Sequence, residues 1–240
     1  METPRSMLIV SAHAADFVWR AGGVIGQHTS NGGKATIVSL SFGENGESGD
    51  LWREPGQTVE AVKSHRHAEA LAASNALGAE FIPMDLGDYP LEVSGASMQK
   101  LASIYVEKIP DVLLVHAPED PFNPDHPVAS FAAQKARLLA TGAGGVPASF
   151  ETIPPPIMYA FEPHQPDLCS FKPDTFVDVT NVWPSKNEAM SAMASQSYLK
   201  EHYTHRAEQR AFQSRYAGFG KDTRYVEAFQ RLTPEKRSYL

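Results

Sequence analysis

Short apolar runs alternate along the chain with longer segments in which apolar residues recur at helical spacing. The apolar runs predict buried strands, at residues 7–11, 35–40, 80–84, 111–116, 157–161 and 175–179. The periodic segments predict helices, at residues 18–30, 59–77, 97–108, 128–139 and over most of 182–216. This alternation is typical of an α/β protein, and it predicts a three-layer, Rossmann-like fold with a mostly parallel sheet.

The chain shows no internal repeat and no linker, so we expect residues 1–240 to form one domain. With 240 residues, of which 42% are hydrophobic and 20% charged, it is long enough to bury a sizeable core. The segment 218–240 is polar and aromatic by turns, and it could instead be an arm that packs on a neighbouring subunit of a homo-oligomer.

Composition also narrows the cellular setting and the partners. There is no run of about 18 apolar residues, and the N-terminus lacks the pattern of a secretory signal, so we expect neither membrane insertion nor export. The single cysteine, Cys169, has no partner for an internal disulfide, which fits a reducing cytoplasm. A net charge of -7 argues against nucleic acid as a partner, but a small anionic substrate needs only a local cluster of positive charge.

Two predicted strands end in potential metal ligands. The first strand leads directly to His13 and Asp16, and the strand at 111–116 leads to a proline-rich loop at 120–127 that contains His126. Because α/β proteins build sites at strand ends, a histidine, an aspartate and a second histidine could meet there. That set suits zinc with an open position for chemistry. Alternatively, Asp16 could simply cap the helix that follows it.

Several motifs resemble the LmbE/PIG-L family of zinc-dependent N-deacetylases, in the same order along the chain. They are His13-Ala14-Ala15-Asp16, Gly43-Glu44-Asn45-Gly46-Glu47, Arg66 and Glu69 ahead of Leu77-Gly78, Asp125-His126, and Val177-Asp178-Val179-Thr180. The resemblance implies the fold of that family and one zinc ion per chain, with His13, Asp16 and His126 as ligands. In the family's first motif, His-Pro-Asp-Asp, the first aspartate is the general base, and here that position is Ala15.

Ala15 has no ionisable group, and this departure bears on the reaction. Hydrolysis of an amide at a zinc site needs a base that takes a proton from the metal-bound water, a contribution of about 10²–10⁴-fold in rate. Either the protein is an altered zinc-dependent deacetylase of an N-acetylated sugar derivative, or it performs another reaction of water with a base from elsewhere. A third reading is a binding protein that keeps the fold and the metal only for structure.

The chain also resembles a hydratase branch of this family, which adds water to an unsaturated keto acid with three carboxylates. The strings that carry this resemblance are Ser11-Ala12-His13, Ala15-Asp16-Phe17-Val18-Trp19-Arg20, Ser41-Phe42-Gly43-Glu44, Gly46-Glu47-Ser48, Leu51-Trp52-Arg53, Gly87-Asp88-Tyr89-Pro90 and Phe161-Glu162-Pro163-His164-Gln165-Pro166. The resemblance implies a zinc-dependent hydro-lyase of aromatic-compound catabolism, with a small tricarboxylate as its substrate.

Hydration of such a substrate requires proton transfers, for which Glu47, Glu44 and His164 are candidate catalytic residues. Glu47 lies in a glycine-rich loop just past the second predicted strand, at the same edge as His13, although it could be a solvated loop carboxylate. His164 follows the strand at 157–161, and a histidine near its ordinary pKa of about 6.5 exchanges a proton at neutral pH. The alternative for His164 is a turn residue.

The carboxylates of the substrate need positively charged partners, and guanidinium groups bind carboxylates in two places at once. We expect Arg20, Arg53 and Arg66 to bind substrate, because each follows a strand end or lies on a helix that faces one. Each could instead form a surface salt bridge. Tyr89 could add a hydroxyl donor or serve only in packing, and His116, at a strand end, could support a metal ligand.

Overall fold

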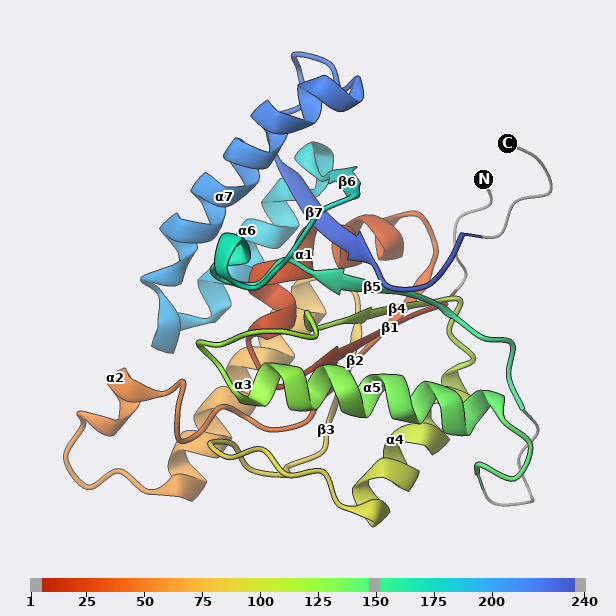
Figure 1. Cartoon of the computed structure of the whole chain (residues 1–240). Helices are drawn as coiled ribbons and strands as arrows, with labels where there is room; N and C mark the ends of the chain where they lie inside the picture. Colours follow the sequence, from red (N-terminus) through yellow and green to blue (C-terminus); the bar gives the residue numbers. More distant parts are fainter. Residues whose placement is uncertain (1–5, 147–151, 236–240) are drawn as a thin grey trace.

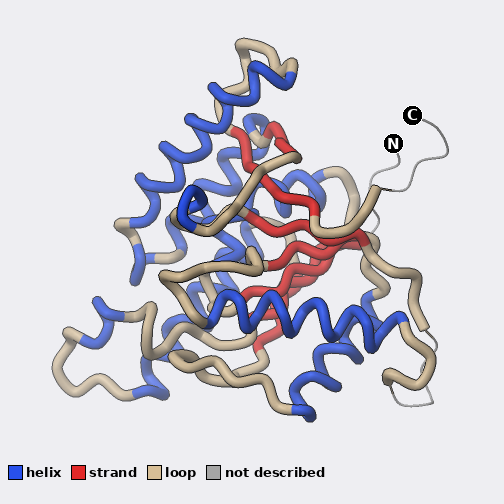
Figure 2. The backbone as a smooth tube through the Cα atoms, viewed as in Figure 1, coloured by secondary structure: helices blue, strands red, loops and turns tan. Residues whose placement is uncertain are grey.

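Seven strands form one sheet at the centre of the computed structural model, which describes residues 6–146 and 152–235 (Figure 2). They are β1 (Ser6–Ser11), β2 (Lys34–Ser39), β3 (Glu80–Pro83), β4 (Val112–Val115), β5 (Ile157–Phe161), β6 (Thr175–Asp178) and β7 (Val226–Arg231). Their order across the sheet is β3-β2-β1-β4-β5-β7-β6. The first five are parallel to one another, whereas β7 is antiparallel to β5 and to β6. The prediction of a mostly parallel sheet is confirmed.

Helices cover both faces of the sheet, as Figure 1 shows. One face carries the paired helices α4 (Gly95–Lys108) and α5 (Asp125–Thr141). The other face carries α1 (Asp16–Ser30), α3 (Val59–Ala76), α6 (Trp183–Ala192) and α7 (Leu199–Ser214). A single helical turn, α2 (Gly49–Trp52), lies in the long connection after β2. The three predicted layers are therefore present.

The strand β1 contributes to the hydrophobic core on each side of the sheet. Met7 and Ile9 belong to the core formed with α1, α3 and α6, whereas Leu8 and Val10 belong to the core formed with α4 and α5. Successive side chains of a strand point to opposite faces, so a strand that is covered on both sides needs apolar residues at every position. This is why the first apolar run of the sequence is continuous.

The strand order reverses at β1, and this reversal determines where the functional site lies. From β1 the chain adds β2 and β3 on one side, and it then returns to add β4 and β5 on the other side. The loops that leave β1 and β4 therefore diverge at the carboxyl edge of the sheet. Such a switch point opens a crevice, where ligands of doubly wound α/β proteins bind.

The C-terminal segment corrects an expectation from the sequence. Instead of leaving the domain as an arm, it supplies β7, which pairs with β5 and β6 inside the sheet. The sequence pattern hid this strand because Glu227 is a charged residue at a buried position, where it pairs with Lys186 at 2.6 Å. The last five residues of the expected arm, 236–240, lie outside the described residues.

The start of α1 also differs from the sequence-based alternative. Asp16 is the first residue of the helix, and Ala15 occupies the N-cap position without a side-chain hydrogen bond. The carboxylate of Asp16 is therefore not the N-cap, and it faces the crevice instead. Within residues 6–146 and 152–235, every helix is too short or too polar to cross a membrane.

Candidate active site

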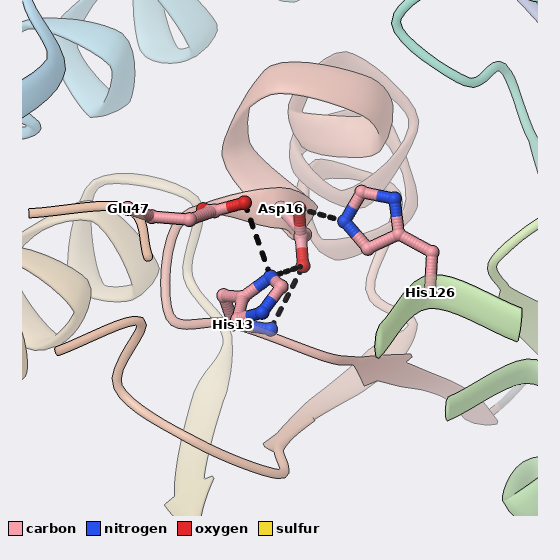
Figure 3. Close-up of side chains that lie close together, drawn as sticks. All are labelled: His13, Asp16, Glu47 and His126. Carbon is pink, nitrogen blue, oxygen red and sulfur yellow. Dashed lines mark hydrogen bonds and ion pairs between the residues drawn. The ribbon is translucent and has the colours of Figure 1, made fainter. Parts of the chain in front are cut away.

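Side chains that follow three strands meet in the crevice between β1 and β4 (Figure 3). His13 and Asp16 follow β1, Glu47 lies in the loop after β2, and His126 lies in the first turn of α5, after β4. One potential ligand atom from each residue lies within 4.8 Å of the other three. The structure thus gathers the three ligands expected from the sequence and adds Glu47 to them. We call these four residues the metal cluster.

Each histidine of the cluster is held by a carboxylate behind its ring. The Nε2 atom of His13 lies 3.3 Å from Oδ2 of Asp125, which also accepts the backbone N–H of Tyr89 at 2.9 Å. The Nδ1 atom of His126 lies 2.7 Å from Oδ2 of Asp120. Metal-binding histidines commonly use one ring nitrogen in this way and present the other nitrogen to the metal. Asp120 and Asp125 both lie in the proline-rich loop, where the sequence showed polar residues without assigning these two a role.

The ring nitrogens that face the cluster lie near carboxylates but form no hydrogen bond within the part of the chain that the structure describes. Neither Nδ1 of His13 nor Nε2 of His126 has a hydrogen-bond partner among the described residues. An oxygen of Glu47 lies 3.2 Å from Nδ1 of His13, and one of Asp16 lies 3.3 Å from it, without hydrogen-bond geometry. Buried polar atoms are rarely left unpaired. Two imidazole nitrogens that converge with carboxylates are a suitable donor set for a divalent metal ion such as zinc, so these residues fit one.

Asp16 is shared between the metal cluster and Arg20. Its buried carboxylate forms an ion pair with Arg20, one helical turn later, and accepts the backbone N–H of His13 at 2.8 Å. Burial alone would raise the pKa of Asp16, but Arg20, His116 and His126 together outweigh this effect and hold the pKa well below its usual range. The carboxylate is therefore ionised, as a metal ligand must be.

The loop after β2 holds Glu47 in a confined position. Gly43 has a positive φ of 72°, and a Cβ there would lie 3.2 Å from the Cβ of Glu47, while a Cβ at Gly46 would overlap the ring of Tyr89. Only 15% of the Glu47 side chain is exposed, so it is not a solvated loop carboxylate. Burial would raise the pKa of Glu47, but the interactions with His13 and His126 together outweigh burial and lower it, so the carboxylate is ionised.

His164 follows β5 and is held by residues of α7. Its ring stacks on His202 with the centroids 4.3 Å apart, and its Nδ1 atom lies 3.5 Å from the hydroxyl of Tyr203. Burial and the neighbouring His202 lower the pKa of His164 to about 4. The ring is therefore uncharged at neutral pH, whereas the sequence alone suggested a pKa near 6.5. His202, which contributes to this shift, lies far from His164 along the chain, so no local sequence pattern predicts the low pKa.

A cavity of about 260 Å³ opens on the metal cluster. Its walls include Arg20, Tyr89 and His164, which the sequence singled out for substrate binding or catalysis. They also include Tyr198 and Tyr203, which it did not. Both tyrosines come from a helical stretch without a motif, and only the tertiary fold brings that stretch to the crevice.

Three residues expected at the site lie outside this cavity. Arg53 is exposed and pairs with a carboxylate of its own turn, beside a neighbouring hollow of about 470 Å³ that also borders Glu47. Arg66 is completely buried, and its guanidinium binds other protein groups. Glu44 is also buried, where its Oε2 atom accepts a backbone N–H of its own loop. The structure therefore does not bring Arg66 or Glu44 to the cavity wall.

His116 packs beneath the metal cluster. Its Nε2 atom accepts the backbone N–H of Ala12 at 3.0 Å, and its ring stacks on His126 with the centroids 4.1 Å apart. Burial and the neighbouring His126 lower the pKa of His116 to about 3. His116 is therefore an uncharged ring that fixes the position of His126 by packing.

Comparison with known proteins is consistent with this geometry. The sequence profile of the PIG-L family, described as GlcNAc-PI de-N-acetylase, matches residues 8–137. The chain belongs to the PIG-L family. A 4-oxalmesaconate hydratase from Pseudomonas putida is 45% identical over 238 residues, which cover 98% of this chain and 92% of that protein. A 1D-myo-inositol 2-acetamido-2-deoxy-alpha-D-glucopyranoside deacetylase 2 from Catenulispora acidiphila is 28% identical, over 61% of this chain and 55% of that protein.

Among solved structures, too, a hydratase is more similar to this chain than a deacetylase is. The 4-carboxy-2-hydroxymuconate hydratase from Pseudomonas putida matches with a TM-score of 0.94 and 44% identity, over 98% of this chain and 99% of that chain. An N,N'-diacetylchitobiose deacetylase from Pyrococcus horikoshii matches with a TM-score of 0.79 but only 18% identity, over 95% and 84% of the two chains. The second match shows a shared fold alone. This PIG-L chain is thus more similar to the hydratase than to the deacetylase.

Proposed function

We propose that this PIG-L protein is a zinc-dependent hydratase of aromatic-compound catabolism, the degradation of gallate and related acids. It adds water to 4-carboxy-2-hydroxymuconate, whose keto form is 4-oxalomesaconate, and yields 4-carboxy-4-hydroxy-2-oxoadipate. The observation that carries the proposal is the 45% identity to the 4-oxalmesaconate hydratase, which extends over 98% of the chain.

The residue at position 15 favours hydration over deacetylation. In the deacetylases that the chain resembles, this position carries the general base, whereas here it is an alanine with 0% of its surface exposed. Hydrolysis of an amide would therefore lack the group that moves a proton from water to the leaving amine. Addition of water to a double bond expels no amine, so it does not need that group.

The reaction forms two bonds across the carbon–carbon double bond of the keto form, each carbon of which bears a carboxylate. The oxygen of water bonds to the carbon β to the keto group, and this water gives up one proton. The other alkene carbon, which is α to the terminal carboxylate and becomes carbanionic, takes one proton. The atoms of one water molecule are consumed, and neither an oxidant nor a reductant is required.

Two residues are suited to these proton transfers. Glu47 is ionised and is itself a member of the metal cluster, so it can take the proton from the attacking water. His164 is uncharged and lines the same cavity. The proton that water gives up, once it reaches this ring, forms an imidazolium that is a stronger acid than an ordinary one, so the proton passes readily to that alkene carbon.

The remaining residues would bind the substrate and the metal ion. Arg20 and Tyr89 line the cavity, where a guanidinium and a hydroxyl can donate hydrogen bonds to carboxylates. Zinc bound by the proposed ligands His13, Asp16 and His126 would polarise an oxygen atom of the substrate or of water. Arg53, at the adjacent hollow, adds an exposed positive charge on the approach of an anionic substrate.

The setting of the enzyme is part of the same proposal. A single free cysteine, Cys169, fits a reducing cytoplasm. The exposed apolar side chains Phe131 and Leu138 on the outer face of α5 support assembly into a homo-oligomer.

A spectrophotometric assay of the purified, metal-loaded protein on 4-carboxy-2-hydroxymuconate tests the proposal. The expected result is loss of the absorbance of the conjugated substrate, with the hydroxylated keto acid as the single product. N-acetylglucosaminides are assayed in parallel. Release of acetate from these sugars, without hydration of the muconate, would establish the deacetylase reading instead.

A further inference from the structure

A buried arginine lies behind the metal cluster rather than on the cavity wall. Arg66, on α3, has 0% of its surface exposed. Its Nε donates to the carbonyl of Phe42 at 3.2 Å, and its Nη1 donates to Glu69 Oε2 at 2.9 Å and to Ser195 Oγ at 2.6 Å. Its Nη2 donates to Oε1 of Gln196 at 3.0 Å. A buried charge destabilises a protein unless its hydrogen-bond donors have partners. The partners around Arg66 supply four hydrogen bonds to its guanidinium.

The contact with Gln196 determines which way that amide points. Gln196 is 4% exposed and lies in the short 3₁₀ turn Ala194–Gln196 after α6. Two groups that only donate, the guanidinium of Arg66 and the indole of Trp19, face its Oε1 atom at 3.0 and 3.5 Å. The carbonyl end of the amide must therefore face them. The NH₂ end consequently faces away from Arg66.

The NH₂ group of Gln196 faces the carboxylate of Glu47. Its Nε2 atom lies 3.5 Å from Oε2 of Glu47, and Nδ2 of Asn123 lies 3.2 Å from the other oxygen, Oε1. The NH₂ group of an amide only donates hydrogen bonds, so both amides donate to the carboxylate. Each oxygen of Glu47 thus has one amide donor, and one of those donors is oriented by a buried guanidinium.

We propose that Arg66 and Gln196 are positioning residues, which form a relay that orients the Glu47 carboxylate for proton transfer. The proposal rests on the hydratase function proposed above. Arg66 therefore acts on catalysis through two other side chains and not by binding substrate. Glu69 and Ser195 alone would hold α3 to the 3₁₀ turn, because Glu69 accepts the Ser195 backbone N–H at 2.7 Å. This contact between α3 and the turn does not require the amide of Gln196 to reach Glu47.

The variant Gln196→Leu tests the relay directly, since it removes the amide and keeps a side chain of similar size. A hydrogen bond to a charged group contributes enough that kcat should fall about tenfold to hundredfold, with KM changed less than about threefold. The matched control is Gln27→Leu. Gln27 is a glutamine of α1 that donates to the carbonyl of Asp178 at 3.1 Å, away from the cavity. It should keep the wild-type kcat.

A double-mutant cycle separates positioning from a general structural effect. In the background of Glu47→Gln, Gln196→Leu should lower kcat no further, because the group it orients is already gone. The variant Arg66→Lys keeps the charge beside Glu69 but cannot donate to Gln196 in the same geometry. It should lower kcat to a similar extent and not add to Gln196→Leu. Equal losses from Gln196→Leu in both backgrounds, or a wild-type kcat for that variant, would overturn the relay.

A structural readout keeps the test independent of the substrate. Should the wild-type protein fail to hydrate 4-carboxy-2-hydroxymuconate, the proposed function fails, and the relay is then tested by crystal structures of the wild type and of Gln196→Leu. The relay predicts that the Glu47 carboxylate is rotated or disordered in the variant. An unchanged and ordered carboxylate would overturn it. Should Arg66→Lys not fold, Gln196→Leu still carries both readouts.

Discussion

The Nε2 atom of His13 lies 3.3 Å from Oδ2 of Asp125, although the two residues follow different strands. His13 follows β1, and Asp125 begins α5 after β4. Because Asp125 occupies one ring nitrogen of His13, the other nitrogen is directed toward the metal cluster. Asp125 also accepts the backbone N–H groups of Tyr89 and Leu91, both at 2.9 Å, so its own position is fixed.

The substitution Asp125→Asn should therefore weaken metal binding without unfolding the protein. It keeps the size of the side chain but removes the charge that supports His13, and losses of this kind lower metal affinity about 10–100-fold. Competition with a chromophoric chelator measures the affinity, and Asp120→Asn tests the equivalent support of His126. Wild-type affinity in both variants would show that these carboxylates do not hold the ligands.

The proton-transfer roles predict a second set of effects. Glu47→Gln and His164→Ala should each lower kcat by about 10²–10⁴-fold, the usual contribution of a positioned acid or base. The metal content of both variants should stay near one ion per chain, as elemental analysis can show. Loss of the metal from Glu47→Gln would identify that carboxylate as a ligand, and normal turnover by His164→Ala would remove His164 from the mechanism.

The exposed arginine should affect substrate capture rather than chemistry. Arg53→Ala should raise KM several-fold and leave kcat nearly unchanged, because an electrostatic attraction acts on ground and transition states alike. The effect should shrink as ionic strength rises, since exposed charges are screened by salt. Steady-state kinetics at low and high salt measure it. A fall in kcat at constant KM would contradict this role.

The sequence was sufficient to predict those parts of the site that depend on the residues directly after each strand. A continuous apolar run identifies β1 as a strand that is covered on both faces, and the parallel topology then places His13 and Asp16 at the same edge as His126. The carboxyl ends of neighbouring strands must meet, so the proximity of these three candidate ligands followed from the pattern. Glu47 followed for the same reason, because its loop leaves the adjacent strand β2.

The parts that depend on distant packing could not be predicted. Arg66 lies on a helix that was expected to face the strand ends, but its side chain turns inward because the 3₁₀ turn with Ser195 and Gln196 offers it partners. The low pKa of His164 depends on burial and on His202, which α7 brings beside it. A buried charge such as Glu227 likewise hides a strand from any rule based on hydrophobic alternation.

The half-buried ring of His164 should also make stability depend on pH. Its pKa is about 4 in the folded protein, against about 6.5 for an unfolded histidine, so between these values the unfolded state binds a proton that the folded state excludes. The contribution of His164 is therefore fully present above about pH 6.5 and is lost as the pH falls toward 4. Thermal unfolding at pH 7.5 and 5.0 measures the loss, which should be smaller in His164→Asn. His205→Asn, at an exposed position of α7, is the control and should match the wild type. Equal losses in all three proteins would contradict the assignment.

Restoring a carboxylate at position 15 should not convert the enzyme into a deacetylase. Ala15 is completely buried and belongs to the same hydrophobic core as Phe17 and Val18. A new carboxylate in Ala15→Asp would lose its hydration and lie beside the charge of Asp16, and a buried unpaired charge typically destabilises a fold by several kcal/mol.

For Ala15→Asp we therefore expect a lower melting temperature, at least a tenfold fall in kcat/KM for hydration and no release of acetate from N-acetyl sugars. Ala15→Ser, which adds an atom but no charge, should lose much less of either property. Calorimetry and the two assays together measure the outcome. If Ala15→Asp were as stable and as active as the wild type, position 15 would face neither the core nor the substrate. In that case the alanine would no longer explain why this chain favours hydration.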